Sequence, residues 1–101
     1  MKKRYVYLME STKTGQFKIG VSKDPDVRKK TLETGHGGPL NIRYSFHTEY
    51  PFAVEAQLHQ YFENQRKEGE FFELSIDDTE RFIYLCSLYD NCLTKQNEYL
   101  M

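Results

Sequence analysis

The sequence predicts an α+β fold, a small antiparallel three-stranded sheet flanked by helices in the order β-β-α-β-α-(β)-α. Two observations carry this prediction. Apolar side chains alternate with period two in two short segments, the pattern of half-buried strands, a third short segment is a run rich in Tyr, Val and Leu, and helix start signals precede three longer segments. At 101 residues the chain has the size of one domain. We expect residues 1–93 to form this domain and residues 94–101 to be a poorly packed tail.

The first two strands are expected to form a hairpin. Arg4–Met9 is rich in Tyr, Val and Leu, and Phe17–Val21 has an apolar side chain at every second position. Between them, Glu10–Gly15 has the composition of a turn. Two such runs joined by a short turn are typical of antiparallel neighbours.

A helix and a third strand are predicted next. Asp24 is a favourable N-cap, Pro25 suits the first helical position, and Gly35 suits the C-terminal stop. A Gly-Gly-Pro sequence then interrupts the chain before Leu40–His47. Apolar residues alternate along this last segment, which predicts the third strand.

The second helix is expected to begin at Pro51 and to run to about Arg66. Three aromatic or aliphatic residues, Phe52, Leu58 and Phe62, recur at helical spacing along it, and we expect them to form its buried face. Glu55 and His59 lie beside them in the same helix.

A short extended segment, Glu70–Leu74, leads into the last helix. The pattern Asp77-x-x-Glu80 resembles a capping box and predicts where this helix begins. Its buried stripe is expected to consist of Phe82, Leu85, Cys86, Tyr89 and Leu93.

The net charge of −1 hides a marked asymmetry along the chain. Residues 1–30 contain nine Lys or Arg against three acidic residues, whereas residues 31–101 contain five against twelve. This distribution predicts one side that faces a polyanion and one acidic, solubilising side, although charges that merely solvate a surface would give the same counts.

Several classes of protein are disfavoured by the same sequence. No apolar run approaches the roughly 20 residues that span a bilayer, and no secretory signal is recognised, so we expect a cytoplasmic protein without membrane contact. Cys86 and Cys92 are six positions apart in one predicted helix, too far for a disulfide, and we expect reduced, mostly buried thiols. Neither has a zinc-finger partner.

Several short motifs, taken in order along the chain, resemble the GIY-YIG nuclease superfamily. Tyr5-Val6-Tyr7 matches its first motif and Lys18-Ile19-Gly20 its second, so Tyr7 and Lys18 stand at the positions of two catalytic tyrosines. Arg28 matches the helical arginine, and Glu55 matches the metal-binding glutamate. The resemblance covers about residues 4–75 and is greatest to phage and fungal proteins in which Lys-Ile-Gly replaces Tyr-Ile-Gly.

This resemblance implies an endonuclease that hydrolyses phosphodiester bonds of nucleic acid, with DNA preferred, using one Mg²⁺ or Mn²⁺ on Glu55. A lone carboxylate can hold these hard ions because they keep most of their waters. Arg28 offers a planar charged fork that matches phosphate geometry. We expect neighbouring positive charge to lower the pKa of Tyr7 so that it relays or accepts a proton, and we expect Lys18 to orient the attacking water or to depress that pKa.

Some candidate residues keep more than one role. His59 follows Glu55 by one helical turn, so it is a candidate metal ligand, phosphate donor or general base, or else a structural histidine. Tyr5 shares a strand face with Tyr7 and either assists Tyr7 or is a packing residue. The residues assigned to nucleic-acid binding are Lys23, Lys29, Lys30 and Tyr5.

A second hypothesis is a nucleic-acid- or protein-binding module of the same fold that has lost its chemistry. The asparagine that usually follows the metal-binding glutamate has no clear counterpart, which favours this alternative, whereas Tyr7, Arg28 and Glu55 oppose it. The sequence shows no second DNA-reading domain. We therefore expect slight sequence specificity, or specificity supplied by a protein partner or by substrate structure; the sequence does not indicate an oligomeric state.

Overall fold

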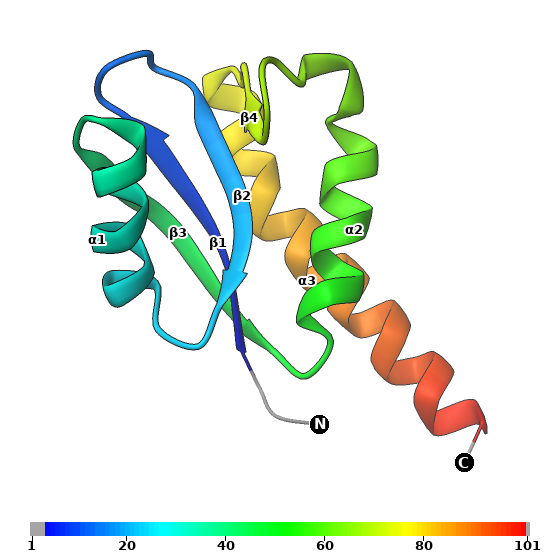
Figure 1. Ribbon diagram of the computed structural model, residues 1–101. Helices are drawn as coiled ribbons and strands as arrows, with labels where there is room; N and C mark the ends of the chain where they lie inside the picture. Colours follow the sequence, from blue (N-terminus) through cyan, green and yellow to red (C-terminus); the bar gives the residue numbers. More distant parts are fainter. Residues whose placement is uncertain (1–3, 101) are drawn as a thin grey trace.

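The structure, a computed structural model, describes residues 4–100 and contains one four-stranded antiparallel sheet with helices on both faces (Figure 1). The strands are β1 (Arg4–Ser11), β2 (Phe17–Ser22), β3 (Leu40–Thr48) and β4 (Phe71–Phe72), in the spatial order β3-β1-β2-β4. The α+β class is confirmed. The sheet has one strand more than expected because Phe71–Phe72 pairs with the start of β2. Lys2 and Lys3 of the basic segment and Met101 of the expected tail lie outside the described residues.

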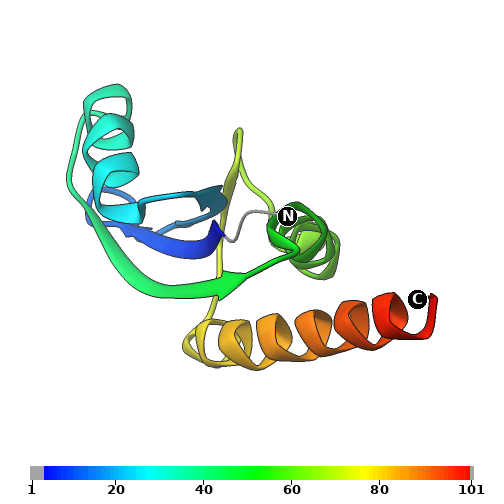
Figure 2. The same ribbon diagram turned by 90° about the horizontal axis from the view of Figure 1, so that it is seen from below.

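The helices are α1 (Pro25–His36), α2 (Pro51–Tyr61) and α3 (Ile76–Leu100), with a short 3₁₀ turn, η1 (Glu63–Gln65), after α2. α1 lies on one face of the sheet, and α2 and α3 lie on the other (Figure 2). No helix in residues 4–100 has the length and apolar character needed to cross a membrane.

The alternation of β1 gives each face its own core. Val6 and Leu8 point into the larger core, between the sheet and the pair α2 and α3. Tyr7 and Met9 point into the smaller core, which Leu32 of α1 covers. The predicted stripe of α3 is confirmed: Phe82, Leu85 and Cys86 are buried, and Tyr89 and Leu93 pack against them.

The N-terminal cap of α1 is confirmed, and its C-terminal stop differs from the prediction. Asp24 accepts hydrogen bonds from the N–H groups of the first turn, at 3.1 and 3.3 Å. The helix ends at His36, and Gly37 is the C-cap, with a φ of 77° and its N–H bonded to Glu33 O. Gly37 adopts the left-handed conformation that glycine tolerates best, whereas Gly35 lies inside the helix.

The second helix is shorter than predicted, ending at Tyr61 rather than near Arg66. After the buried Phe62 the chain tightens into η1. There Gln65 O accepts a hydrogen bond from Glu73 N at 2.8 Å, so the turn ties the connection back towards β4.

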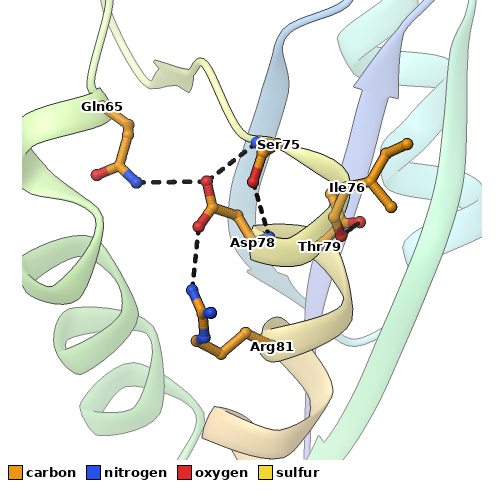
Figure 3. Close-up of polar contacts among 6 residues, drawn as sticks. All are labelled: Gln65, Ser75, Ile76, Asp78, Thr79 and Arg81. Atoms are coloured by element: carbon orange, nitrogen blue, oxygen red, sulfur yellow. Dashed lines mark hydrogen bonds and ion pairs between the residues drawn. The ribbon is translucent and has the colours of Figure 1, made fainter.

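A capping box begins α3, but not at the predicted residues (Figure 3). Asp78 N donates to Ser75 Oγ at 3.1 Å, and Ser75 N donates to Asp78 Oδ2 at 3.0 Å. Burial raises the pKa of Asp78, but the hydrogen bonds from Ser75 and Gln65 outweigh it, and the net pKa is lowered. The predicted cap at Asp77 is wrong because that residue already lies in the first turn.

The end of α3 and its two cysteines complete the fold. The helical backbone continues past Leu93 to Leu100, and its side chains from Lys95 to Glu98 are exposed. Both thiols are free, as expected. Cys86 is buried, which raises its pKa to about 12, but Cys92 is exposed, contrary to the prediction, because it lies outside the buried stripe.

Candidate functional site

A pocket of about 140 Å³ is lined by side chains of β1, β2, α1 and α2. The helices α1 and α2 lie on opposite sides of β2 (Figure 1). β4 pairs only with Phe17 and Lys18, so β2 from Ile19 onwards has no further strand beside it within residues 4–100. Side chains from both faces of the sheet therefore reach the same opening. The lining residues are Tyr7, Lys18, Ile19, Gly20, Val21, Arg28, Phe52, Glu55 and Glu70.

Four of the five predicted catalytic residues meet in this pocket. Tyr7 comes from β1, Lys18 from β2, Arg28 from α1 and Glu55 from α2. Tyr7 and Lys18 share the α1 face of the sheet, as expected, because both belong to the alternate set that points away from the larger core.

The Tyr7 ring lies directly over Gly20, its partner across the two strands. A Cβ atom on residue 20 would stand 2.3 Å from Tyr7 Oη and 2.5 Å from Cζ, well inside the distance that real side chains allow. Only glycine therefore leaves room for the phenol in this position. The motif contained Gly20, but its spacing gave no sign of this contact.

The pKa of Tyr7 is raised, contrary to the expectation that neighbouring charge lowers it. Burial is the largest cause, because Tyr7 is only 1% exposed and a phenolate would lose its hydration. A hydrogen bond from Arg28 and the charge of Arg28 act in the opposite direction but do not outweigh burial. The phenol therefore keeps its proton at neutral pH and can donate a hydrogen bond.

Lys18 is nearly buried, and its ammonium donates a hydrogen bond to the Glu70 carboxylate. This contact, with the charge of Lys18, lowers the pKa of Glu70. Glu70 was not among the predicted site residues. It enters the pocket because Phe71 pairs with Lys18 across β4 and β2, a contact that joins residues far apart in the sequence.

Glu55 is a half-buried carboxylate that makes neither a hydrogen bond nor an ion pair with another described residue. Burial raises its pKa, and the charge of Glu70 adds to this; His59 and Lys18 act in the opposite direction. Removing a carboxylate from water without a partner is unfavourable. Glu55 thus differs from Glu70, the other acidic residue of the pocket lining, because the Glu70 carboxylate forms an ion pair with Lys18.

His59 lies behind the pocket rather than in it. Its Nε2 is 2.9 Å from Ile19 O, and because a carbonyl only accepts, Nε2 carries the proton and donates. The ring also packs against Phe72, with centroids 5.3 Å apart. Of the roles that the sequence left open, this geometry supports the structural one: His59 ties α2 to the edge of β2 and so holds Glu55 in place.

The basic residues assigned to nucleic-acid binding differ in their environments. Lys23 and Lys30 are exposed. Lys29 is engaged by Glu33, with Nζ 3.1 Å from Oε2, and Glu33 also accepts a hydrogen bond from Leu40 N at 2.8 Å. These contacts lower the pKa of Glu33. Lys29 is therefore part of the connection between α1 and β3.

Tyr5 shares a strand face with Tyr7 but lies outside the Tyr7 pocket. It stacks on His47, with ring centroids 4.6 Å apart and an interplanar angle of 19°. With Lys23 it lines a separate hollow of about 360 Å³ at the start of α1.

Phe52 is 64% exposed, so its predicted place in the buried face of α2 is wrong. The buried positions of that helix are Pro51, Val54 and Leu58. Phe52 precedes Val54 by two residues, which places it about 200° around the helix from that side chain. It lies instead on the side that carries Glu55, three residues later, and lines the pocket.

The residues of the pocket suit a hard cation that keeps most of its water ligands, rather than a cation that is coordinated by several protein side chains. Within residues 4–100 no group of three or more His, Cys, Asp or Glu side chains is arranged to hold a metal. A single partner-free carboxylate suits Mg²⁺ or Mn²⁺, which keep several waters when bound. Because a water occupies about 30 Å³, a pocket of about 140 Å³ also has room for such waters.

Comparisons with known proteins give one match. The model of the T5orf172 domain matches residues 4–87, which include every residue of the pocket. No curated protein matches, and no solved structure matches. Since the match extends over most of the described residues, the chain belongs to the T5orf172 domain family.

Proposed function

We propose that this protein is a metal-dependent endonuclease of the GIY-YIG type that hydrolyses nucleic-acid phosphodiester bonds, with DNA as the preferred substrate and one Mg²⁺ or Mn²⁺ on Glu55. One observation carries the proposal: a single pocket gathers a phenol, an ammonium, a guanidinium and a partner-free carboxylate from four different elements. The T5orf172 domain, a phage-associated domain related to nuclease-like domains of the HNH and GIY-YIG types, agrees with this function.

Each side chain has a physical role in this proposal. The Arg28 guanidinium binds the non-bridging oxygens of the scissile phosphate, whose negative charge grows in the transition state. Lys18 adds a second positive charge from the sheet. Tyr7, whose pKa is raised by burial, keeps its proton at neutral pH and donates a hydrogen bond to a phosphate oxygen. A divalent ion on Glu55 would supply further positive charge beside the same phosphate.

A binding module without catalysis is the second candidate function. The observation that favours it is the ion pair between the Lys18 ammonium and the Glu70 carboxylate. Of the two cations in the pocket lining, only Arg28 then has no anionic partner. Such a protein would still attract a polyanion through its exposed Lys23 and Lys30.

The decisive experiment is cleavage of labelled single- and double-stranded DNA with Mg²⁺, with Mn²⁺ or with a chelator. Glu55→Gln keeps the shape of the side chain but removes the charge that holds the ion, so we expect cleavage to be lost with this variant and with the chelator. Glu80→Gln is the matched control because Glu80 is an exposed acid of α3 outside the pocket lining. Equal cleavage by wild type and Glu55→Gln would exclude the proposed site. Salt-sensitive binding without cleavage by the wild type would support the binding module.

A further inference from the structure

Phe52 is a large apolar side chain at an unexpected place, the mouth of a charged pocket. It lies in the first turn of α2 and is 64% exposed. Of the exposed large apolar side chains within residues 4–98, whose exposure the structure describes, it is the one that lines this pocket. The others are Val27, Tyr61, Ile76, Tyr84 and Leu88. Single exposed apolar side chains are common on protein surfaces, so it is the place of Phe52 in the pocket lining that makes it a candidate ligand contact.

The surroundings of Phe52 suggest which chemistry this ligand has. The helix α1 lies on the opposite side of β2 from α2 (Figure 1). It contributes Arg28 to the pocket lining, and the planar charged guanidinium of that residue matches the geometry of a phosphate. On the near side, Phe52 and Glu55 lie three residues apart on one side of α2. A group that reaches from Arg28 to Phe52 has an anionic part and a flat apolar part. A nucleotide has both, since a base is joined to each phosphate through the sugar.

We propose that Phe52 is a stacking platform for an unpaired nucleobase next to the scissile phosphate, and that the substrate is single-stranded nucleic acid or the unpaired strand of a flap or end. This proposal rests on the proposed function. Within a duplex both faces of a base are covered by its neighbours, so the ring of Phe52 has no face to contact. In a single strand the face is free, and stacking on an aromatic side chain accepts every base.

Binding to a non-cleaved strand tests the proposal independently of catalysis. The probe is a short fluorescently labelled oligodeoxythymidine, titrated with the full chain in a chelator and followed by fluorescence anisotropy. Phe52→Ala should weaken binding by roughly five- to a hundredfold, because base stacking contributes about 1–3 kcal/mol and 1.4 kcal/mol corresponds to a factor of ten. Phe52→Trp should bind at least as tightly as wild type, and Phe52→Leu should resemble Phe52→Ala.

Two controls separate stacking from a general disturbance of the pocket. Tyr84→Ala removes an aromatic ring that is 65% exposed on α3, outside the pocket lining, and should leave binding unchanged. The slope of log affinity against log salt should be the same for Phe52→Ala and wild type, because the substitution removes no charge. A duplex of the same sequence should bind Phe52→Ala and wild type equally.

Two results would overturn the stacking site whatever the cleavage assay gives: unchanged affinity of Phe52→Ala for the single strand, or an equal loss of affinity for single strand and duplex. Conversely, binding that depends on Phe52 in a protein that does not cleave DNA with either ion would reject the endonuclease and keep the stacking site. The two proposals therefore fail separately.

Discussion

The contact between Tyr7 and Gly20 leads to a prediction whose size follows from the geometry. In Gly20→Ala the new Cβ would stand 2.3 Å from Tyr7 Oη, whereas ordinary contacts begin at 3.4 Å, so the hydroxyl must retreat by about 1.1 Å or the strands must separate. The Tyr7 side chain is only 1% exposed, so it has little room to move aside. Overpacking of this kind costs about 1–3 kcal/mol of unfolding free energy.

The chain supplies a matched control for this substitution. Gly35 lies in α1 without a positive φ, and no atom lies within 4 Å of the position that its Cβ would take. Gly35→Ala should therefore stabilise the protein by about 0.4–1 kcal/mol, through the unfolded chain and helix propensity. Gly20 also lacks a positive φ, so backbone strain does not contribute to its substitution.

Urea unfolding of the two variants measures how much the clash between the new Cβ of residue 20 and the Tyr7 ring lowers the unfolding free energy. We expect the midpoint of Gly20→Ala to fall and that of Gly35→Ala to rise while the slopes stay equal, which indicates that stability alone has changed. In a Tyr7→Ala background the cost of Gly20→Ala should largely disappear, because the double-mutant cycle removes the clash. If the proposed endonuclease is correct, displacing the hydroxyl by about 1 Å should also slow cleavage by about a hundredfold. Equal stability of Gly20→Ala and Gly35→Ala would refute the packing of Tyr7 over Gly20.

Three further predictions concern the α3 cap, the pKa of Glu55 and the basic face. Ser75→Ala should cost about 1 kcal/mol and lower Tm by about 4–8 °C, whereas Asp77→Asn should change Tm little; the reverse order in a thermal melt would contradict the observed cap. Burial raises the pKa of Glu55, so protons should compete with Mn²⁺ for this carboxylate at a higher pH than they would at an ordinary glutamate. The affinity for Mn²⁺, measured by calorimetry, should therefore begin to fall at a pH above the usual pKa of a glutamate. Glu70→Gln removes a negative charge that raises the pKa of Glu55, so the loss of Mn²⁺ affinity should begin at a lower pH in this variant. A shift to higher pH would reject the electrostatic coupling between Glu70 and Glu55. Lys30→Gln should reduce the salt slope of single-strand binding by about 0.7, and an unchanged slope would show that Lys30 contacts no phosphate.

The local elements of the fold could be predicted because their signals lie within a few residues. The period-two alternation of β2 placed Phe17, Ile19 and Val21 on the side of the larger core, and the Asp24 cap depends on N–H groups two and three residues away. Element ends were harder to predict. The structure places the stop of α1 at Gly37 rather than at the predicted Gly35, and the cap of α3 at Ser75 rather than at the predicted Asp77.

The residues of the candidate site also differ in whether the sequence could predict them, according to whether they depend on local motifs or on distant contacts. The resemblance singled out Tyr7, Lys18, Arg28 and Glu55, and the structure brings these four side chains to one pocket. Glu70 and the exposed position of Phe52 were missed. The first depends on the pairing of β4 with β2 and the second on which side of α2 packs against the sheet. Neither feature can be recognised from neighbouring residues along the chain.

The amino-acid sequence by itself determined the strand alternation, most of the helix starts and the residue types that suit phosphate and a hard cation, because these depend on neighbours along the chain. Only the tertiary structure decided the direction in which the pKa of Tyr7 shifts, the need for glycine at position 20 and the structural hydrogen bond of His59. Each of these depends on burial or on contacts across the sheet. Water exclusion and close packing arise only when distant segments meet, and they set the pKa values and the space on which the proposed chemistry depends.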